Sequence, residues 1–250
     1  MILSKKNKFL FIKGRKVAST SVEVFLSSFC GTEDIITPIT PVDEKRRVLS
    51  KGLFAQNYGA DKNELKQYIS AITQCDNFQN FNNEIPRGEY FNHMSLVEIQ
   101  QKFGEISSDY LIFAIDRNPY RKIISRANMA LSFKQYKKNG KPMINSIDEV
   151  KEVVGWLIKN NRLDSVKNIH LYKNKLGKVV TKILKYEDLP IEIDKIMGKL
   201  KIPQYPKLPH LKKGLSSSDV ELQDFFTKEN IKIINEHFHE EFSQNGYEML

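Results

Sequence analysis

Two short apolar segments, each followed at once by a cationic turn and a helix start, indicate the fold class of this chain. Residues 8–12 (KFLFI) are a predicted strand that runs into the turn 13–18 and a helix from about Thr20 to Phe29. Residues 110–115 (YLIFAI) are a continuous apolar run, typical of a strand buried on both faces of a sheet. Strands that alternate with helices predict an α/β domain of three layers, α/β/α, with a central, mostly parallel sheet.

Further helices are predicted around these two units. Ser95 and Glu98 form a capping box for a helix that ends at Gly104, and Asn118 with Pro119 starts a helix that runs to about residue 138. Weaker patterns predict helices at 61–80, 147–161, 191–200 and 228–243, a hairpin from NIHLY and VVTKILKY, and Pro-rich loops at 37–47 and 203–214.

The composition is that of a globular protein with a basic surface. Of the 250 residues, 40% are hydrophobic and 28% are charged, and the formal net charge is +9. We expect a single domain over residues 1–250, because no internal repeat and no interdomain linker occurs. The charge favours a polyanionic partner, such as nucleic acid, a phosphorylated cofactor, an acidic glycan or an anionic membrane, although a solvated lysine-rich surface also explains it.

The cysteines and the apolar segments bear on the compartment. Cys30 and Cys75 form no CxxC pair and no zinc-type cluster, so a reduced cytosolic setting without a structural disulfide is the simplest account. The apolar run near the N-terminus is too short for a secretory signal, and no stretch of about 18 or more apolar residues exists. We therefore expect a cytoplasmic protein without stable membrane insertion.

The turn at 13–18 and the helix start after it have the composition of an anion-binding site. A helix N-terminus offers unpaired N–H groups and the positive end of the helix dipole, which suit phosphate or sulfate. Lys16 adds a point charge, and Ser19, Thr20 and Ser21 add hydroxyl donors. The sequence is not a Walker A loop, since no GxxxxGK[ST] occurs. A plain turn with hydroxyl caps is the alternative interpretation.

A second cationic segment follows the second predicted strand. Arg117 leaves the end of that strand, where ligands of open α/β sheets gather. Ser125 lies on the same helical stripe as Asn118 and Lys122, so an arginine and a hydroxyl could hold one phosphate from two sides. Ordinary surface residues would give the same pattern. Asp116 imitates the magnesium ligand of a Walker B strand, but the Walker A half is missing.

Together these stretches resemble the PAPS-dependent sulfotransferases. FIKGRKVASTSVEVF is similar to the 5′-phosphosulfate loop of that family, FIHIPKTGGTSIE, with Lys16 at the motif lysine and Thr20 and Ser21 at its Thr-Ser. FAIDRNPYRKIISR is similar to the 3′-phosphate motif, FVRNPYDRLVSAY, with Arg117 and Ser125 at its Arg and Ser.

Three further stretches carry the resemblance along the chain in the family's order. YFNHMSLVEI resembles the segment that supplies a catalytic His in the heparan 2-O-sulfotransferase branch. ILKYEDL (183–189) resembles ILRYEDL, and INEHFHEEFSQNGY (234–247) resembles the terminal helix that ends in FGY. The five stretches span residues 9 to 247 and imply the P-loop-like sulfotransferase fold.

Several residues depart from the family pattern. Arg15 replaces a Pro, and Ala18 and Ser19 replace two Gly, which Ala and Ser can do if the backbone keeps an ordinary φ. Asp116 stands where an apolar residue is usual, and Arg121 replaces the Asp of NPYD. These changes bear on the geometry of the loop more than on the class of cofactor.

The resemblance implies transfer of the sulfuryl group of 3′-phosphoadenosine 5′-phosphosulfate (PAPS) to an acceptor hydroxyl, or less readily an amine, without a metal. The product of the donor would be 3′-phosphoadenosine 5′-phosphate (PAP). Lys16 would neutralise the bridging oxygen and His93 would accept the proton of the acceptor, with His210 as the alternative base. The cofactor would be held by residues of both motifs and of the loop at 203–214: Arg15, Lys16, Ala18, Ser19, Thr20, Ser21, Arg117, Ser125 and Lys213.

Other interpretations stay open from the sequence alone. His93 could be an ordinary packing histidine, and a P-loop kinase or nucleotide hydrolase would require ATP and magnesium. A non-catalytic binder of nucleic acid or acidic glycan would carry a basic, aromatic stripe, of which KQYKKNGK (134–141) is the best fragment. Residues 32–90 and 140–170 match no family motif. We expect a carbohydrate acceptor and no nucleic acid, with lipids or small metabolites as alternatives, and no oligomeric state is predicted.

Overall fold

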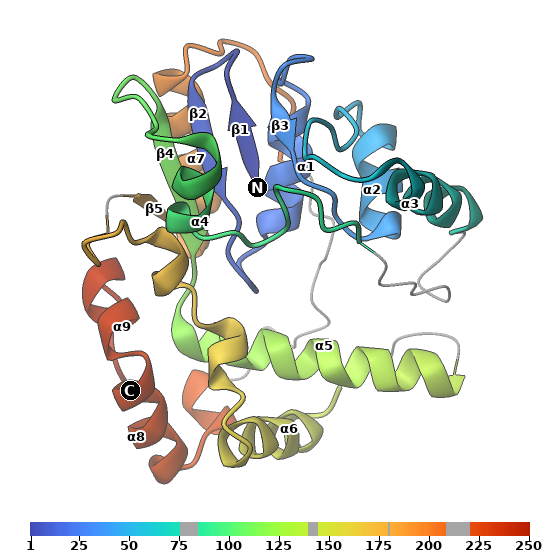
Figure 1. Cartoon of the computed structure of the whole chain (residues 1–250). Coiled ribbons are helices and arrows are strands. Elements are labelled where there is room, and N and C mark those ends of the chain that lie inside the picture. Colours follow the sequence, from blue (N-terminus) through green and yellow to red (C-terminus); the bar gives the residue numbers. More distant parts are fainter. Residues whose placement is uncertain (76–84, 140–144, 180, 209–220) are drawn as a thin grey trace. The chain divides into compact units, whose positions relative to one another are not determined.

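The computed structural model describes residues 1–75, 85–139, 145–179, 181–208 and 221–250 (Figure 1). Contacts divide the chain into two compact units. Unit 1 comprises Met1–Gly14, Ala18–Ile115 and His170–Leu211, and unit 2 comprises Arg15–Val17, Asp116–Ile169 and Lys212–Leu250. In the described part of the chain, no helix is both long enough and apolar enough to cross a membrane.

Unit 1 is built on a five-stranded mixed sheet. Its strands, in the spatial order β3-β1-β2-β4-β5, are β1 (Ile2–Ser4), β2 (Phe9–Ile12), β3 (Ile35–Ile36), β4 (Leu111–Asp116) and β5 (Lys182–Lys185). β1 pairs antiparallel with β2 and β3, whereas β2 and β4 are parallel, with Phe9 opposite Leu111 and Ile12 opposite Ala114. The predicted α/β class is confirmed. The sheet is mixed rather than mostly parallel, because the N-terminal hairpin adds antiparallel strands.

The two predicted strands form the centre of this sheet. All four side chains of β2 are fully buried, and Phe113 of β4 packs against Phe9 and Phe11, with ring centroids 6.0 and 5.4 Å apart. Burial on both faces explains why their sequences are continuous apolar runs instead of alternating ones. The turns that follow them therefore start from the buried centre of the sheet.

The helices of unit 1 are α1 (Ser19–Ser27), α2 (Pro41–Leu49), α3 (Lys62–Gln74), α4 (Leu96–Phe103) and α7 (Leu189–Lys199). The capping box of α4 is present as predicted, with Ser95 and Glu98 bonded to each other's backbone N–H. The predicted loop at 37–47 is wrong, since α2 starts inside it. Thr40 caps that helix by accepting the N–H of Asp43, and a proline follows at the first helical position, which suits its fixed φ.

The predicted hairpin that ends in β5 forms only in part. Its first half is the 3₁₀ helix η2 (Ile169–Tyr172), and an isolated antiparallel bridge joins Lys173 to Val179. The hydroxyl of Tyr172, a fully buried residue, donates to the carbonyl of Ile115 at 2.9 Å. The other 3₁₀ helices are η1 (Leu163–Val166), η3 (Tyr186–Asp188) and η4 (Leu222–Phe225).

Unit 2 is helical, with α5 (Pro119–Asn139), α6 (Ile147–Lys159), α8 (Lys228–His237) and α9 (His239–Asn245). Asn118 caps α5 as predicted, because its Oδ1 accepts the N–H of Tyr120 at 3.0 Å. The single helix predicted at 228–243 is two helices, separated at Phe238, whose φ and ψ of −105° and 14° are not helical. That phenylalanine is fully buried in the apolar core that α5, α6, α8 and α9 share.

Candidate functional site

The turn between β2 and α1 keeps a backbone shape that glycine favours. Ala18, the N-cap of α1, has φ 55° and ψ 18°, and Lys16 has φ 62°. The left-handed conformation costs a residue with a Cβ roughly 1–2 kcal/mol. The backbone therefore does not take an ordinary φ at Ala18, and the alanine accepts strain that a glycine would avoid. The helix N-terminus also lacks a side-chain cap at this residue.

The hydroxyl groups at the start of α1 differ in their roles. Ser19 Oγ donates to the carbonyl of Gly14 at 2.6 Å and is buried, so this hydroxyl closes the turn. Ser21 is buried and Thr20 is half-buried. Among the described residues, no carbonyl accepts the N–H groups of Ser19 and Thr20. These amides and the helix dipole suit an anion.

Within unit 2, the middle of this turn lies against α5 and the segment before η2. Lys16 Nζ lies 3.3 Å from Met129 Sδ, one helical turn beyond Ser125 on the same face of α5. Arg15 is bonded through its backbone: its N–H donates to Asn168 Oδ1 at 2.8 Å, and its carbonyl accepts from Asn168 Nδ2 at 3.0 Å. Lys16 thus contacts the face of α5 on which the predicted 3′-phosphate residue Ser125 lies.

Asp116, at the end of β4, is a buried structural carboxylate. Its Oδ1 accepts from Lys122 Nζ and from the N–H of Arg117, both at 2.8 Å, and its Oδ2 accepts from Asn245 Nδ2 at 3.1 Å. Lys122 Nζ also donates to Glu241 Oε2 at 2.5 Å. Lys122 is therefore an internal counterion, although it lies on the predicted stripe with Ser125. This buried cation explains how Asp116 is accommodated at a position where the similar family motif has an apolar residue.

Two pKa values reflect the buried cluster. Burial lowers the pKa of Lys122, but the charges of Asp116 and Glu241 outweigh it, so the pKa of Lys122 is raised. Burial and the Asp116 charge raise the pKa of Glu241 against the opposing effect of Lys122. The cluster holds its charges by mutual attraction away from water. Arg117 and Ser125 are half-buried and lie beside it, at the start of α5 and two turns into that helix.

His93, in unit 1, is tied to the residue that begins the turn. Its φ is 61°, and its Nδ1 lies 3.0 Å from the carbonyl oxygen of Lys13. Because a carbonyl can only accept, Nδ1 carries the hydrogen, and Nε2 is then the basic nitrogen of the neutral ring. The arrangement has the tautomer that a general base requires.

Lys13 itself has a structural side chain. Its Nζ donates to Glu23 Oε2 at 2.6 Å, Arg47 Nη2 lies 3.7 Å from the same oxygen, and all three side chains are buried. Burial raises the pKa of Glu23, but Lys13 and Arg47 are among the cations that lower it to about 2. Of the two lysines in the turn, Lys16 rather than Lys13 is therefore the candidate for contact with a ligand.

The alternative base His210 and the predicted cofactor residue Lys213 lie outside the described residues. His239 is exposed, whereas His237 is half-buried, with Nε2 3.0 Å from Asp164 Oδ1, and burial lowers its pKa. A search of the described residues finds no group of three or more His, Cys, Asp or Glu side chains that could hold a metal ion.

Asn168 is the residue of this region that the sequence did not single out. It is fully buried, and its side chain joins the turn at Arg15 to Asp116, whose Oδ1 lies 3.4 Å from Nδ2. Comparison with models of known families, with characterised proteins and with solved structures finds no match for this chain. The resemblance to the sulfotransferases therefore rests on the motif residues alone.

Proposed function

We propose that this protein is a sulfotransferase that moves the sulfuryl group of PAPS to a hydroxyl of a carbohydrate acceptor. The observation that carries the proposal is the parallel pairing of β2 with β4. Because these strands are neighbours, the turn with Lys16 and the segment with Arg117 leave the sheet at the same edge, where α/β sheets bind their ligands. We further propose the P-loop-like, three-layer sulfotransferase architecture.

Two anion-binding segments match the two phosphates of the cofactor. The N–H groups at the start of α1, with Thr20 and Ser21, would bind the 5′-phosphosulfate. Arg117 and Ser125 would bind the 3′-phosphate, which distinguishes PAPS from ATP. The contact of Lys16 with Met129, one turn beyond Ser125, supports a single ligand that spans both segments.

The proposed reaction is an in-line displacement at sulfur. The acceptor oxygen attacks the sulfur atom, the bond from sulfur to the bridging oxygen breaks, and negative charge develops on the 5′-phosphate of PAP. Lys16 would neutralise that charge, and Nε2 of His93 would take the acceptor proton. The hydrogen bond of Nδ1 to the Lys13 carbonyl supports this role, since it orients the ring and sets the tautomer.

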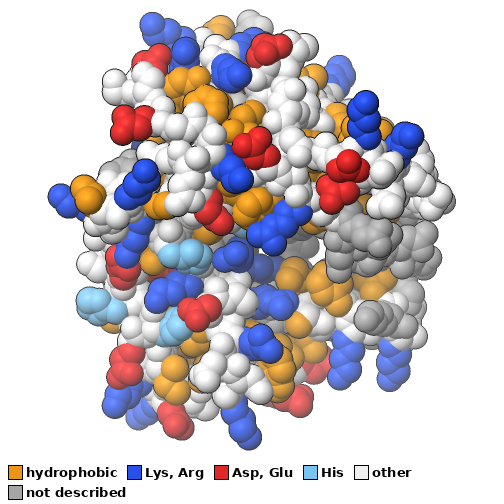
Figure 2. Space-filling model, viewed as in Figure 1, with side chains coloured by type: hydrophobic (Ala, Val, Ile, Leu, Met, Phe, Trp, Pro, Cys, Tyr) orange, Lys and Arg blue, Asp and Glu red, His pale blue; other side chains and the backbone are white. Residues whose placement is uncertain are grey.

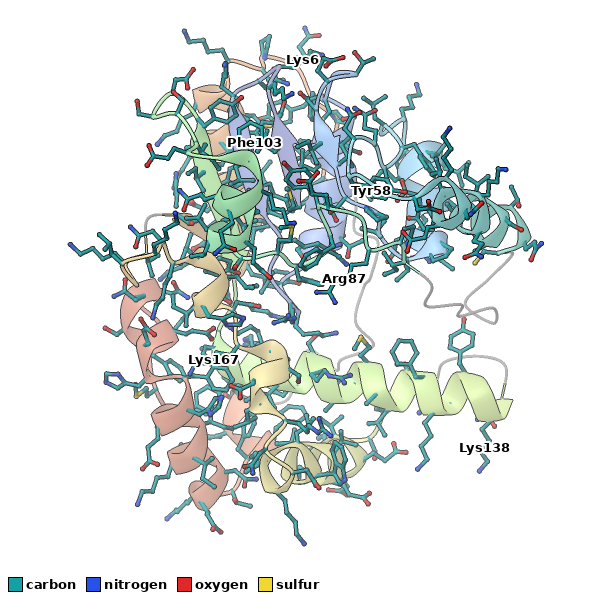
Figure 3. All side chains as sticks on the ribbon, viewed as in Figure 1. Lys6, Tyr58, Arg87, Phe103, Lys138 and Lys167 are labelled. Carbon is teal, nitrogen blue, oxygen red and sulfur yellow. The ribbon has the colours of Figure 1, made fainter. Side chains whose placement is uncertain are left out.

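The observations favour PAPS over the alternative ligands. A magnesium-dependent kinase would need a carboxylate at the end of β4 for the metal, but Lys122 and Asn245 already bind the oxygens of Asp116. A binder of nucleic acid would need a basic stripe. On the face shown in Figure 2, both Lys and Arg side chains and Asp and Glu side chains are exposed, and Lys138 of the KQYKKNGK segment is exposed near the end of α5 (Figure 3).

Calorimetry with PAP and 5′-AMP tests the proposal. Wild type should prefer PAP, and Arg117→Ala should lose that preference because the mutant retains only the 5′ contacts. Arg121→Ala is the matched control, since it removes the same charge from an exposed position on the first turn of α5. Equal affinity of the wild type for PAP and 5′-AMP would overturn the proposal.

A further inference from the structure

The side-chain amide of Asn168 binds both backbone groups of one residue in the turn. Its Oδ1 accepts the N–H of Arg15 at 2.8 Å, and its Nδ2 donates to the carbonyl of Arg15 at 3.0 Å. Asn168 is fully buried and lies 153 positions further along the chain. Two bonds to one residue fix the orientation of the peptide groups on both of its sides, and the second of these groups leads into Lys16.

The turn needs such a restraint. Lys16 and Ala18 have positive φ values of 62° and 55°, and strained conformations persist only where surrounding contacts determine them. Arg15 also stands where the similar family motif has proline. An arginine lacks the fixed φ of proline and adds an N–H group that requires an acceptor when water is excluded. The amide of Asn168 supplies both the restraint and the acceptor.

Asn168 is itself held by a carboxylate. Its own N–H and that of Ile169 donate to Glu241 Oε1 at 2.5 and 3.0 Å. The preceding residue, Lys167, is labelled in Figure 3, and its Nζ donates to the carbonyl of His237 at 2.9 Å. The segment is therefore attached to the C-terminal helices of unit 2 at three consecutive residues, 167–169.

The same amide also reaches the second anion-binding segment. Asn168 Nδ2 lies 3.4 Å from Asp116 Oδ1, and this oxygen accepts the N–H of Arg117 at 2.8 Å. Asn168 is thus the point at which the turn with Lys16 joins the cluster that precedes Arg117. Asn245, another buried amide, donates to the other oxygen of this carboxylate, Asp116 Oδ2, at 3.1 Å.

We propose that Asn168 is a positioning residue for the 5′ half of the cofactor site, an inference that rests on the proposed function. Asn168 sets the turn that carries Lys16, so its loss displaces the groups that bind the 5′-phosphate. The 3′-phosphate contacts of Arg117 and Ser125 stay in place, because Asp116, which Lys122 and Asn245 also hold, keeps the N–H of Arg117, and α5 carries Ser125.

Calorimetry with three nucleotides separates this role from a structural one. Asn168→Ala should weaken binding of 5′-AMP and PAP by about tenfold or more, the equivalent of about 1.4 kcal/mol, and leave 3′-AMP unchanged. Asn245→Ala is the matched control: it removes a buried amide from the same cluster, so it should lower the melting temperature without changing the ratio of the 5′-AMP and 3′-AMP affinities.

Asn168→Asp is the second variant, in case Asn168→Ala does not fold. It keeps the volume and the acceptor for the Arg15 N–H but replaces the donor to the Arg15 carbonyl, and the same loss for 5′-AMP is expected. Equal losses for all three nucleotides, or a lower melting temperature with unchanged affinities, would overturn the positioning role. Failure of the wild type to bind any of the three would overturn the proposed function, and the positioning role with it.

Discussion

The ammonium of Lys122 is buried between Asp116 and Glu241, and this cluster decides how well the end of β4 is held. Replacing the lysine leaves two carboxylates without their counterion away from water. Breaking a buried pair in this way typically costs about 3–5 kcal/mol. Replacing Lys122 alone removes both ion pairs of the cluster, because its ammonium donates to both carboxylates.

Lys122→Met should therefore lower the free energy of unfolding by about 3–5 kcal/mol in urea denaturation, since methionine fills the volume but supplies no charge. Lys195→Met is the control, because Lys195 forms an exposed ion pair with Glu192, and it should leave the unfolding midpoint unchanged. Equal midpoints for the wild type and Lys122→Met would contradict the description of the cluster.

The lowered pKa of Glu23 predicts that the stability of the folded chain depends on pH in the acidic range. Its pKa is about 2 in the folded chain against an ordinary 4.5, so its contribution is complete above about pH 4.5 and is lost as the pH falls towards 2. Glu23→Gln should be less stable than the wild type at neutral pH, and the difference should shrink as the pH falls through this range. Denaturation midpoints at a series of pH values measure it, and a difference independent of pH would contradict the assignment.

A substitution of His93 can separate the orientation of this side chain from its proposed role as the base. His93→Asn tolerates the positive φ and can still donate to the Lys13 carbonyl, but it has no basic nitrogen. It should lower kcat by about a hundredfold or more and leave the affinity for PAP unchanged. The measurement is release of PAP from PAPS with an unsulfated glycosaminoglycan as acceptor, and an undiminished rate would place the base at another residue.

Among the secondary-structure elements, the turn before α1 contains an alanine, Ala18, in a left-handed conformation that glycine favours. Ala18→Gly removes the steric penalty of a Cβ at φ 55° and should raise the free energy of unfolding by about 1 kcal/mol. Ala130→Gly, inside α5, is the control of opposite sign and should lower the free energy of unfolding by about 1 kcal/mol. Thermal or urea unfolding measures both, and a loss of stability in Ala18→Gly would contradict the positive φ.

Elements with strong local signals were predictable from the sequence. The capping box at Ser95 and the Asn118-Pro119 start of α5 depend on residues a few positions apart, so the sequence contains the whole signal. The strands β1 and β3, of three and two residues, are too short for any periodicity. The start of α2 at Thr40 was missed, because its two flanking prolines also suit a loop.

The candidate site was predictable only in the part that lies in contiguous motifs. Lys16, Arg117 and Ser125 follow from two stretches of sequence, and His93 from a third. Asn168 acts through a contact across 153 positions, and nothing in the neighbouring residues distinguishes it from a surface asparagine. The buried role of Lys122 was likewise hidden, because it depends on Glu241, which lies 119 positions away.

For the whole molecule, we propose that one nucleotide with two phosphates spans the two segments at the carboxyl edge of the sheet. The parallel pairing of β2 with β4 gives both segments their common origin, and the Asn168 amide joins them within unit 2. The net charge of +9 is compatible with an anionic ligand but does not identify it.

A crystal structure of the complex with PAP would show whether one nucleotide binds both segments. We expect the 5′-phosphate at Lys16 and the first N–H groups of α1, and the 3′-phosphate within hydrogen-bond distance of Arg117 and Ser125. A nucleotide bound at another surface, or one whose 3′-phosphate points into solvent away from Arg117, would contradict this proposal.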